Sequence, residues 1–284
     1  MTVVRVRGLV KSYGAVRAVR GIDLDIVAGE VFAVLGPNGA GKSTTVEILE
    51  GYRRRDAGEV SVLGVDPERA TRAWRARIGI VPQNANDVYE LTVRETVRHH
   101  ARFYPAPADP DEVIERVGLA EKAGARVGKL SGGQRRRLDV ALAVIGRPEL
   151  LFLDEPTTGF DPEARRRLWE LLAGLAHRGT TIVLTTHYLD EAETLADRVA
   201  VVVRGRVTAL GDPRTLGGRA TGEATVAWTE DGERRSVRTS TPSAAVAELT
   251  RRFDGEVPEL TVTRPTLEDV YLDLIGTGGE EAER

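Results

Sequence analysis

The chain has little of several residue types that would otherwise define its chemistry. It contains no cysteine, one methionine and four lysines among 284 residues. Without cysteine it cannot form disulfides, and it cannot offer a thiolate as a nucleophile or a metal ligand. It also lacks an excess of positive charge, since 40 Lys and Arg residues against 43 Asp and Glu residues give a formal net charge of −3. This balance argues against a general nucleic-acid binder, and we expect no nucleic-acid partner.

Long apolar runs are missing too. A membrane-spanning helix needs about 20 largely apolar residues. The longest stretches without Asp, Glu, Lys or Arg have 11 residues, at Val31–Gly41 and Gly179–Leu189. The N-terminus contains no apolar core of the kind found in secretory signal peptides. We therefore expect a cytoplasmic protein that reaches a membrane only through a partner.

Glycine and proline are too scarce for a low-complexity chain. They make up 43 of 284 residues, or about 15%, against the roughly 25–30% that marks such chains. The sequence therefore predicts a folded protein. Its length is near the upper limit for one hydrophobic core, so we expect one large domain, alone or with a small appendage.

Short apolar runs that alternate with helical spacing predict an α/β class for the large domain. The expected strands are residues 3–7, 21–26, 31–35, 150–153, 181–185 and 199–203. The expected helices are residues 42–49 and 134–145, with two more that begin near Asp161 and Tyr188. Helix-capping signals at Thr92 and Asp109 predict a helical insertion at about residues 86–148.

Beyond residue 218 the pattern changes to that of a small α+β appendage. Strands at 224–229 and 234–239 flank Asp231-Gly232, a hairpin signal, and are followed by a helix at 242–253, a strand at 260–263 and a helix at 266–275. We therefore expect a domain over residues 1–218, an accessory domain over 219–276 and a disordered tail over 277–284.

A phosphate-binding motif follows the apolar run at 31–35. Residues 36–43 read Gly-Pro-Asn-Gly-Ala-Gly-Lys-Ser, which matches the P-loop pattern G-x-x-x-x-G-K-[ST]. Glycines let backbone N–H groups surround phosphate oxygens, and the following helix points the positive end of its dipole at the anion. Lys42 supplies positive charge for the β- and γ-phosphates, and Ser43 supplies a hydroxyl ligand for Mg²⁺. The predicted nucleotide-binding residues are Gly36, Pro37, Asn38, Gly39, Ala40, Gly41, Lys42, Ser43 and Thr44.

A second apolar run ends in two acidic residues. Leu150–Leu153 is followed by Asp154 and Glu155. A P-loop site needs a carboxylate for the metal on a second buried strand, so we predict Asp154 as an Mg²⁺ ligand. Glu155 is placed to orient or deprotonate a water. A solvated acidic turn is the alternative, and the P-loop disfavours it. No Asn-Lys dipeptide is present to read guanine, so we do not expect guanine as the base.

The motif that identifies a family lies about 20 residues before Asp154. Leu130 precedes Ser131, Gly132, Gly133 and Gln134. This Leu-Ser-Gly-Gly-Gln motif, together with the P-loop, resembles the ATP-binding subunit of ABC transporters. Its serine and glycines lead into a helix start, which is a second anion site. The resemblance implies a P-loop NTPase core with an antiparallel β subdomain and a helical insertion, and a homodimer in the ATP-bound state in which this motif closes on ATP held by the other subunit.

The resemblance also implies roles for four single residues, each of which would be unremarkable alone. Tyr13 matches the aromatic residue that stacks on adenine, and Gln83 matches the glutamine that reaches Mg²⁺ and water. His187 matches the histidine at the γ-phosphate, and Asp161 matches the aspartate that communicates across the dimer. Phe160 departs from the leucine that is usual before this aspartate. The implied catalytic residues are Lys42, Glu155 and His187, the implied Mg²⁺ ligands are Ser43, Gln83 and Asp154, and the implied cofactors are ATP and Mg²⁺.

Residues 263–271, Thr-Arg-Pro-Thr-Leu-Glu-Asp-Val-Tyr, resemble the C-terminal extension of drug-resistance and ABC-2-type exporter ATPases. The resemblance implies an ATPase subunit that powers a membrane exporter of drugs or other hydrophobic or amphipathic compounds. It would act through a separate transmembrane permease subunit on the inner face of the membrane, and we expect the permease contact at residues 84–91.

The alternative is a soluble ABC-type ATPase coupled to nucleic acid or translation. Such proteins usually carry two cassettes or a long coiled coil, whereas this chain has one cassette and no heptad run. Three arginine triplets, at residues 53–55, 135–137 and 165–167, are predicted to be solvated surface rather than nucleic-acid contacts.

Overall fold

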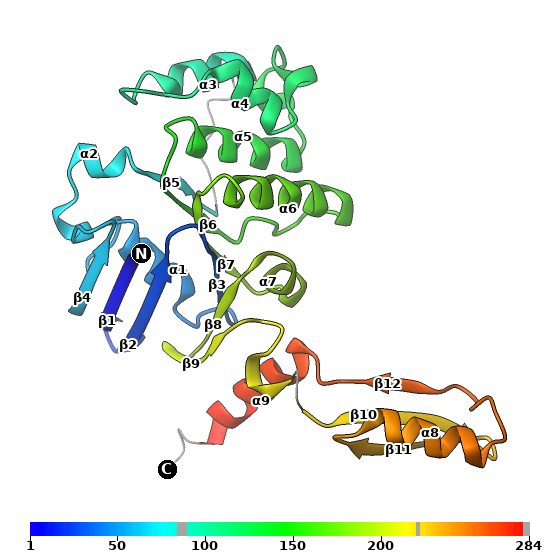
Figure 1. Cartoon of the computed structure of the whole chain (residues 1–284). Helices are drawn as coiled ribbons and strands as arrows, with labels where there is room; N and C mark the ends of the chain where they lie inside the picture. Colours follow the sequence, from blue (N-terminus) through cyan, green and yellow to red (C-terminus); the bar gives the residue numbers. More distant parts are fainter. Residues whose placement is uncertain (84–89, 220–221, 281–284) are drawn as a thin grey trace. The chain divides into compact units, whose positions relative to one another are not determined.

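The computed structural model describes residues 1–83, 90–219 and 222–280, with side chains described up to residue 276 (Figure 1). The chain divides into two compact units, residues 1–208 and 209–284. This division lies ten residues before the expected domain boundary at residue 218. In the part of the chain that is described, no helix has both the length and the apolar character that crossing a membrane requires.

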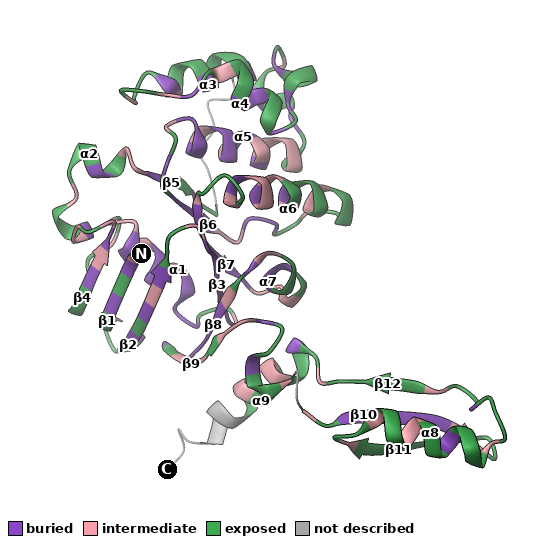
Figure 2. Cartoon of the chain, viewed as in Figure 1, coloured by how far each residue is buried: buried purple, intermediate pink, exposed green. Residues whose placement is uncertain are grey.

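A six-stranded sheet forms the centre of the first unit. Its strand order is β5-β6-β7-β3-β8-β9, and the pairs from β5 to β8 are parallel. The strands are β3 (Val31–Leu35), β5 (Ile78–Val81), β6 (Leu150–Asp154), β7 (Thr181–Thr186), β8 (Arg198–Val203) and β9 (Arg206–Gly211). Figure 2 shows the central strands buried along most of their length. The parallel pairing gathers the carboxyl ends of β3, β5, β6 and β7 at one edge, where α/β sheets bind ligands.

A second, antiparallel sheet shares a hydrophobic core with the first. Its strand order is β2-β1-β4, with β1 at Thr2–Tyr13, β2 at Val16–Val27 and β4 at Ala57–Val62. Helix α1 (Lys42–Leu49) packs apolar residues into the core between the sheets. The indole of Trp74, in α2 (Arg72–Arg75), is buried there and donates to the Val62 carbonyl at 2.8 Å. β1 and β2 are longer than predicted, because bulges let them continue through polar residues as a ribbon.

The helical insertion lies between β5 and β6 as predicted. It contains α3 (Val93–Ala101), α4 (Pro110–Arg116) and α5 (Gly132–Val144), with 3₁₀ turns at Ala120–Lys122 and Val127–Lys129. The predicted caps are confirmed, because Thr92 forms a capping box with Glu95 and Asp109 accepts from two backbone N–H groups. The predicted start of α5 at Gln134 is wrong by two residues. Ser131 is the N-cap, and the Gln134 side chain bonds back to its N–H.

The helices after the insertion begin close to the predicted positions. These are α6 (Pro162–Ala176), which follows β6, and α7 (Leu189–Leu195), which follows β7. Asp161 caps α6, since its carboxylate accepts from the Ala164 N–H at 2.8 Å. A further 3₁₀ turn lies at Pro67–Arg69.

The second unit contains the predicted hairpin and two helices. Its antiparallel sheet has the order β11-β10-β12, with β10 at Ala224–Glu230, β11 at Glu233–Thr239 and β12 at Thr261–Thr263. Helix α8 (Pro242–Arg252) packs on Val226 and Trp228, and a 3₁₀ turn precedes the sheet at Leu216–Gly218. Helix α9 (Leu267–Glu280) starts at a cap formed by Thr266 and Asp269.

Helix α9 runs through residues 277–280 of the expected tail, and the disorder of that tail stays a prediction. The glycines at 276, 278 and 279 are poor helix formers, but extending an existing helix costs far less than starting one. The rest of the expected tail lies outside the described residues.

The burial of β6 predicts that substitution of two paired residues lowers the unfolding free energy of the protein by different amounts. Phe152 is fully buried and pairs with Ile80 of β5, which is 37% exposed. Phe152→Ala should cost about 3–5 kcal/mol of unfolding free energy, and Ile80→Ala about 1 kcal/mol or less. Urea unfolding of both variants measures the difference. Equal losses would contradict the assigned burial.

Candidate nucleotide site

The P-loop connects β3 to α1 through two positions that require glycine. A Cβ at Gly36 would lie 2.2 Å from the Val202 carbonyl oxygen. Gly41 has a φ of 99°, and its Cβ would lie 2.2 Å from the Ala18 carbonyl oxygen. Among the described residues no side chain caps the N-terminus of α1. Its first N–H groups are therefore free to bind an anion.

Lys42 is the buried cation of the site. Its ammonium donates to the carbonyls of Gly36 at 2.8 Å and Pro37 at 3.2 Å, and it lies 3.8 Å from Oε1 of Glu155. Burial lowers the pKa of Lys42, while the carboxylates of Glu155 and Asp154 act in the opposite direction. The ammonium group therefore lies between the loop and two acids, where phosphate oxygens would enter.

Asp154 and Ser43 form an oxygen-donor pair at the end of β6. The Ser43 hydroxyl donates to Oδ1 of Asp154 at 3.1 Å, and the Thr185 hydroxyl donates to the same oxygen. Within the described residues no group of three His, Asp or Glu gathers as a metal cage. A hydroxyl and a single carboxylate fit Mg²⁺, because this ion usually takes one or two protein ligands together with phosphate and water.

Glu155 is the meeting point of three strand ends. Gln83 follows β5 and donates to Oε2 of Glu155 at 3.3 Å. His187 follows β7, and its Nδ1 lies 3.4 Å from Oε1 of Glu155 without a hydrogen bond to any described residue. Glu155 itself has a φ of 44°, and its N–H is held by the hydroxyl of Thr185 at 3.0 Å. The structure thus brings Gln83, Glu155, His187 and Lys42 together.

The Leu-Ser-Gly-Gly-Gln motif, hereafter the signature, lines a separate concave site of about 280 Å³, the signature site. Ser131 caps α5, the signature helix, and Gly133 faces Ala164 and Phe160 of the neighbouring segment. Asp161 lies in the same site. None of the described residues that line it belongs to the P-loop. In the described part of one copy, the two predicted anion-binding elements therefore do not line the same pocket.

Tyr13 is another predicted site residue that none of the described contacts joins to the cluster around Glu155. It ends β1 and is 41% exposed. The Arg53 guanidinium lies 5.2 Å from the centre of its ring, and the Lys11 ammonium lies 5.7 Å from it. The ring is accessible for stacking.

Arg136 is a residue of the site that the sequence analysis missed. The prediction that residues 135–137 are solvated is wrong for Arg136, which is only 7% exposed. Its guanidinium donates to the carbonyls of Pro82, Asp154 and Pro156. Helical spacing was the available signal, because position 136 shares a face with the buried residues 140, 143 and 144.

Comparison with known proteins gives a consistent result. A family model described as ABC transporter matches residues 19–158. The daunorubicin resistance ATP-binding protein DrrA3 of Streptomyces coeruleorubidus is 40% identical over 97% of this chain and 96% of its own length. The Nod factor export ATP-binding protein I of Rhizobium sp. (strain N33) is 45% identical over 74% of this chain and 70% of its own length.

Solved structures show the same fold over about three quarters of the chain. The cbiO1 component of the cbiONQ ABC transporter complex of Clostridium perfringens is 30% identical, with a TM-score of 0.69 over 75% of this chain and 89% of its own. A dimeric post-hydrolysis ATP-binding cassette bound to ADP and phosphate is 25% identical, with a TM-score of 0.67 over 74% of this chain and 98% of its own.

The geometry predicts separable effects for Lys42 and Glu155. Lys42→Ala removes the charge beside the loop and should weaken MgATP binding at least about 10-fold. Glu155→Gln keeps the shape of the site but removes the base, so it should leave binding within about 3-fold and slow hydrolysis at least about 100-fold. Nucleotide titration and phosphate release measure the two effects. Turnover of Glu155→Gln at the wild-type rate would refute its assignment as the base.

Proposed function

Because the chain belongs to the ABC transporter family of ATP-binding subunits, we propose that its ATP hydrolysis powers a membrane exporter. The observation that carries the hydrolytic part is the position of one carboxylate, that of Glu155. Its oxygens lie 3.3 Å from Gln83, 3.4 Å from His187 and 3.8 Å from Lys42, beside the Ser43–Asp154 pair. These groups can bind phosphate and activate a water at one point.

The proposed mechanism assigns each group one task. The P-loop N–H groups and Lys42 bind the phosphates and stabilise the negative charge that develops on the γ-phosphate. Ser43 and Asp154 would hold Mg²⁺, with Gln83 beside them, and the bound ion would neutralise phosphate charge. Glu155 orients the attacking water and accepts its proton. His187 presents its imidazole to the γ-phosphate.

A complete site requires a second copy in this proposal. None of the described residues that line the signature site belongs to the P-loop, so we propose a head-to-tail homodimer in which Ser131 and its glycines close on ATP held by the partner copy. The dimeric relative bound to ADP and phosphate supports this arrangement.

Mixing two inactive variants tests the composite site. Lys42→Ala disables a P-loop and Ser131→Arg blocks a signature site, so each variant alone should hydrolyse ATP at a few per cent of the wild-type rate or less. In a 1:1 mixture, heterodimers carry one intact composite site, and activity should recover several-fold. A mixture no more active than its components would contradict the head-to-tail site. Lys42→Ala mixed with Glu155→Gln is the matched control, because both lesions lie in the same half-site.

The exporter part of the proposal rests on the relatives. The names of two of them describe drug resistance and Nod factor export, and the first matches almost the whole chain. We propose that this chain binds a separate permease at the inner face of the membrane and serves drugs or other amphipathic compounds. Co-purification from solubilised membranes followed by a transport assay tests it. Stimulation of the ATPase by RNA or DNA, without a permease, would favour the nucleic-acid alternative.

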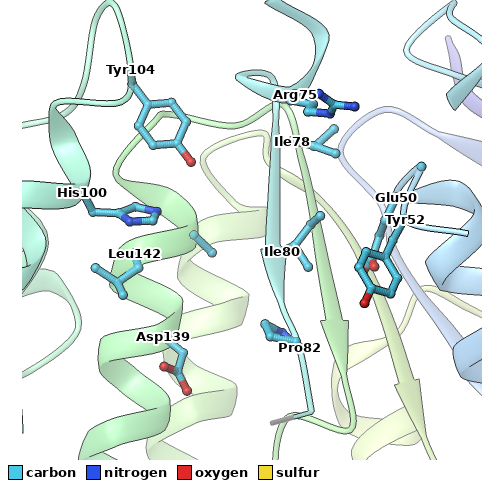
Figure 3. Close-up of a pocket in the computed structure, with 12 residues that line it drawn as sticks. Glu50, Tyr52, Arg75, Ile78, Ile80, Pro82, His100, Tyr104, Asp139 and Leu142 are labelled. Atoms are coloured by element: carbon cyan, nitrogen blue, oxygen red, sulfur yellow. The ribbon is translucent and has the colours of Figure 1, made fainter. Parts of the chain in front are cut away.

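We propose a groove between the sheet and the helical insertion as the docking site of the permease (Figure 3). Its volume is about 530 Å³, and Figure 3 shows Ile78, Ile80 and Pro82 of the β5 segment between two walls. One wall carries Glu50 and Tyr52, and the other carries His100, Tyr104, Asp139 and Leu142. Gln83, Glu155, His187 and Lys42 form what we call the hydrolytic cluster. Pro82 lines the groove and directly precedes Gln83, so the groove is one residue from this cluster. Of the expected contact at residues 84–91, residues 84–89 lie outside the described residues.

Glu50 gives the groove a pH dependence that stability measurements can detect. Burial, reinforced by the negative charges of Asp154 and Glu47, raises the pKa of Glu50 to about 8. The folded state therefore keeps a proton that the unfolded state loses from about pH 4.5 upward, so this carboxyl increasingly destabilises the fold as pH rises to about 8.

Glu50→Gln should match the wild type in stability at pH 5 and exceed it by on the order of 1–3 kcal/mol at pH 9. Urea unfolding at pH 5, 7 and 9 measures this, with the exposed Glu59→Gln as control. A constant difference between wild type and Glu50→Gln at all three pH values would show that the carboxyl does not titrate in this window.

A further inference from the structure

Arg136 connects three segments that the function needs in register. It lies in α5, five residues after Ser131, and its guanidinium is buried. It donates to the carbonyl of Pro82, to that of Asp154 at 2.7 Å and to that of Pro156 at 3.2 Å. A guanidinium presents its N–H groups in a rigid planar fork, so three bonds at once fix the relative positions of all three acceptors.

These acceptors flank the two side chains, Gln83 and Glu155, that the proposed mechanism places beside the attacking water. Pro82 precedes Gln83, while Asp154 and Pro156 lie on either side of Glu155. The pairing of β5 with β6 ends at Val81 and Leu153. Beyond that point the two segments no longer pair with each other, although β6 continues to Asp154 against β7, and the guanidinium bridges them where their pairing has stopped.

The surroundings of Arg136 make this arrangement specific. Burial lowers the pKa of Arg136, and the nearby carboxylates of Asp139, Asp154 and Glu191 oppose that effect. Asp139 lies 3.9 Å from the guanidinium and also lines the groove. Arg136 is thus part of the signature helix and lies between the groove and the hydrolytic cluster. Its hydrogen bonds go to backbone carbonyls and not to any group that the proposed mechanism places in contact with ATP.

We propose that Arg136 is a positioning residue for hydrolysis, which holds Gln83 and Glu155 in register with the signature helix. This rests on the proposed ATPase function and adds to it a path from the signature site and the groove to the water-activating carboxylate. When the signature helix seats on ATP, the fork transmits its position to both strand ends. ATP binding itself depends on the P-loop, which Arg136 does not contact.

The test separates turnover from binding in the purified full chain. Arg136→Met keeps the bulk of the stem and removes the fork, so kcat for ATP should fall at least about 10-fold. Affinity for MgATP, measured in a Glu155→Gln background, should stay within about 2-fold. Arg136→Lys keeps the charge but loses the planar fork, and its kcat should lie between those of Arg136→Met and the wild type.

The matched control is Arg198→Met, which removes a half-buried arginine that also donates to a backbone carbonyl, that of Asp25, away from the site. It should leave kcat within about 2-fold. Wild-type kcat in Arg136→Met, or a fall in ATP affinity as large as the fall in kcat, would overturn the proposal. If Arg136→Met does not fold by near-ultraviolet circular dichroism, Arg136→Lys decides, and wild-type kcat in that variant overturns it. Failure of the proposed function appears separately, as absence of ATP hydrolysis by the wild type.

Discussion

The burial of the parallel strands on both faces is the constraint from which the rest of the site follows. β3 and β7 are apolar or hydroxyl-bearing along their length and nearly closed to solvent, and so is β6 up to its last residue, Asp154. Polar chemistry can therefore begin only where each strand leaves the sheet. Because the strands are parallel, those exits share one edge, and Lys42, Gln83, Asp154 and His187 meet there although they are far apart in the sequence.

That edge concentrates opposing charges that depend on one another. A buried lysine near two carboxylates is tolerable because each offsets the desolvation of the others. Thr185 contributes twice, since its hydroxyl donates to Asp154 and accepts from the N–H of Glu155. This second bond helps to hold Glu155 in its left-handed backbone conformation, which aims its side chain at the ends of β5 and β7 rather than along β6.

The sequence predicted the parts of the site that are contiguous and local. The P-loop, the acidic strand end and the signature are each read within about eight residues, and α1 and β3 were predicted to the residue. Arg136 was missed because its acceptors lie 54, 18 and 20 residues away, and a charged residue in a triplet is usually solvated. The start of α5 was misplaced because glycines disfavour helix, whereas the reciprocal bonds of Ser131 and Gln134 outweigh that cost. The groove needs side chains from distant segments, so no local pattern indicates it.

The same contacts determine how distant events affect one another. In the structure, Pro82 lines the groove and accepts from Arg136, Arg136 belongs to the helix that Ser131 caps, and Asp154 accepts from both Arg136 and Ser43. A shift of any of these segments changes the free energy of the others. If an occupant of the groove prefers the register that hydrolysis needs, then by linkage ATP held between two copies must strengthen binding of that occupant by the same factor. Whether occupancy of the groove or of the ATP site strengthens binding at the other is therefore set by this shared network of contacts. It does not depend on which of the two sites is occupied first.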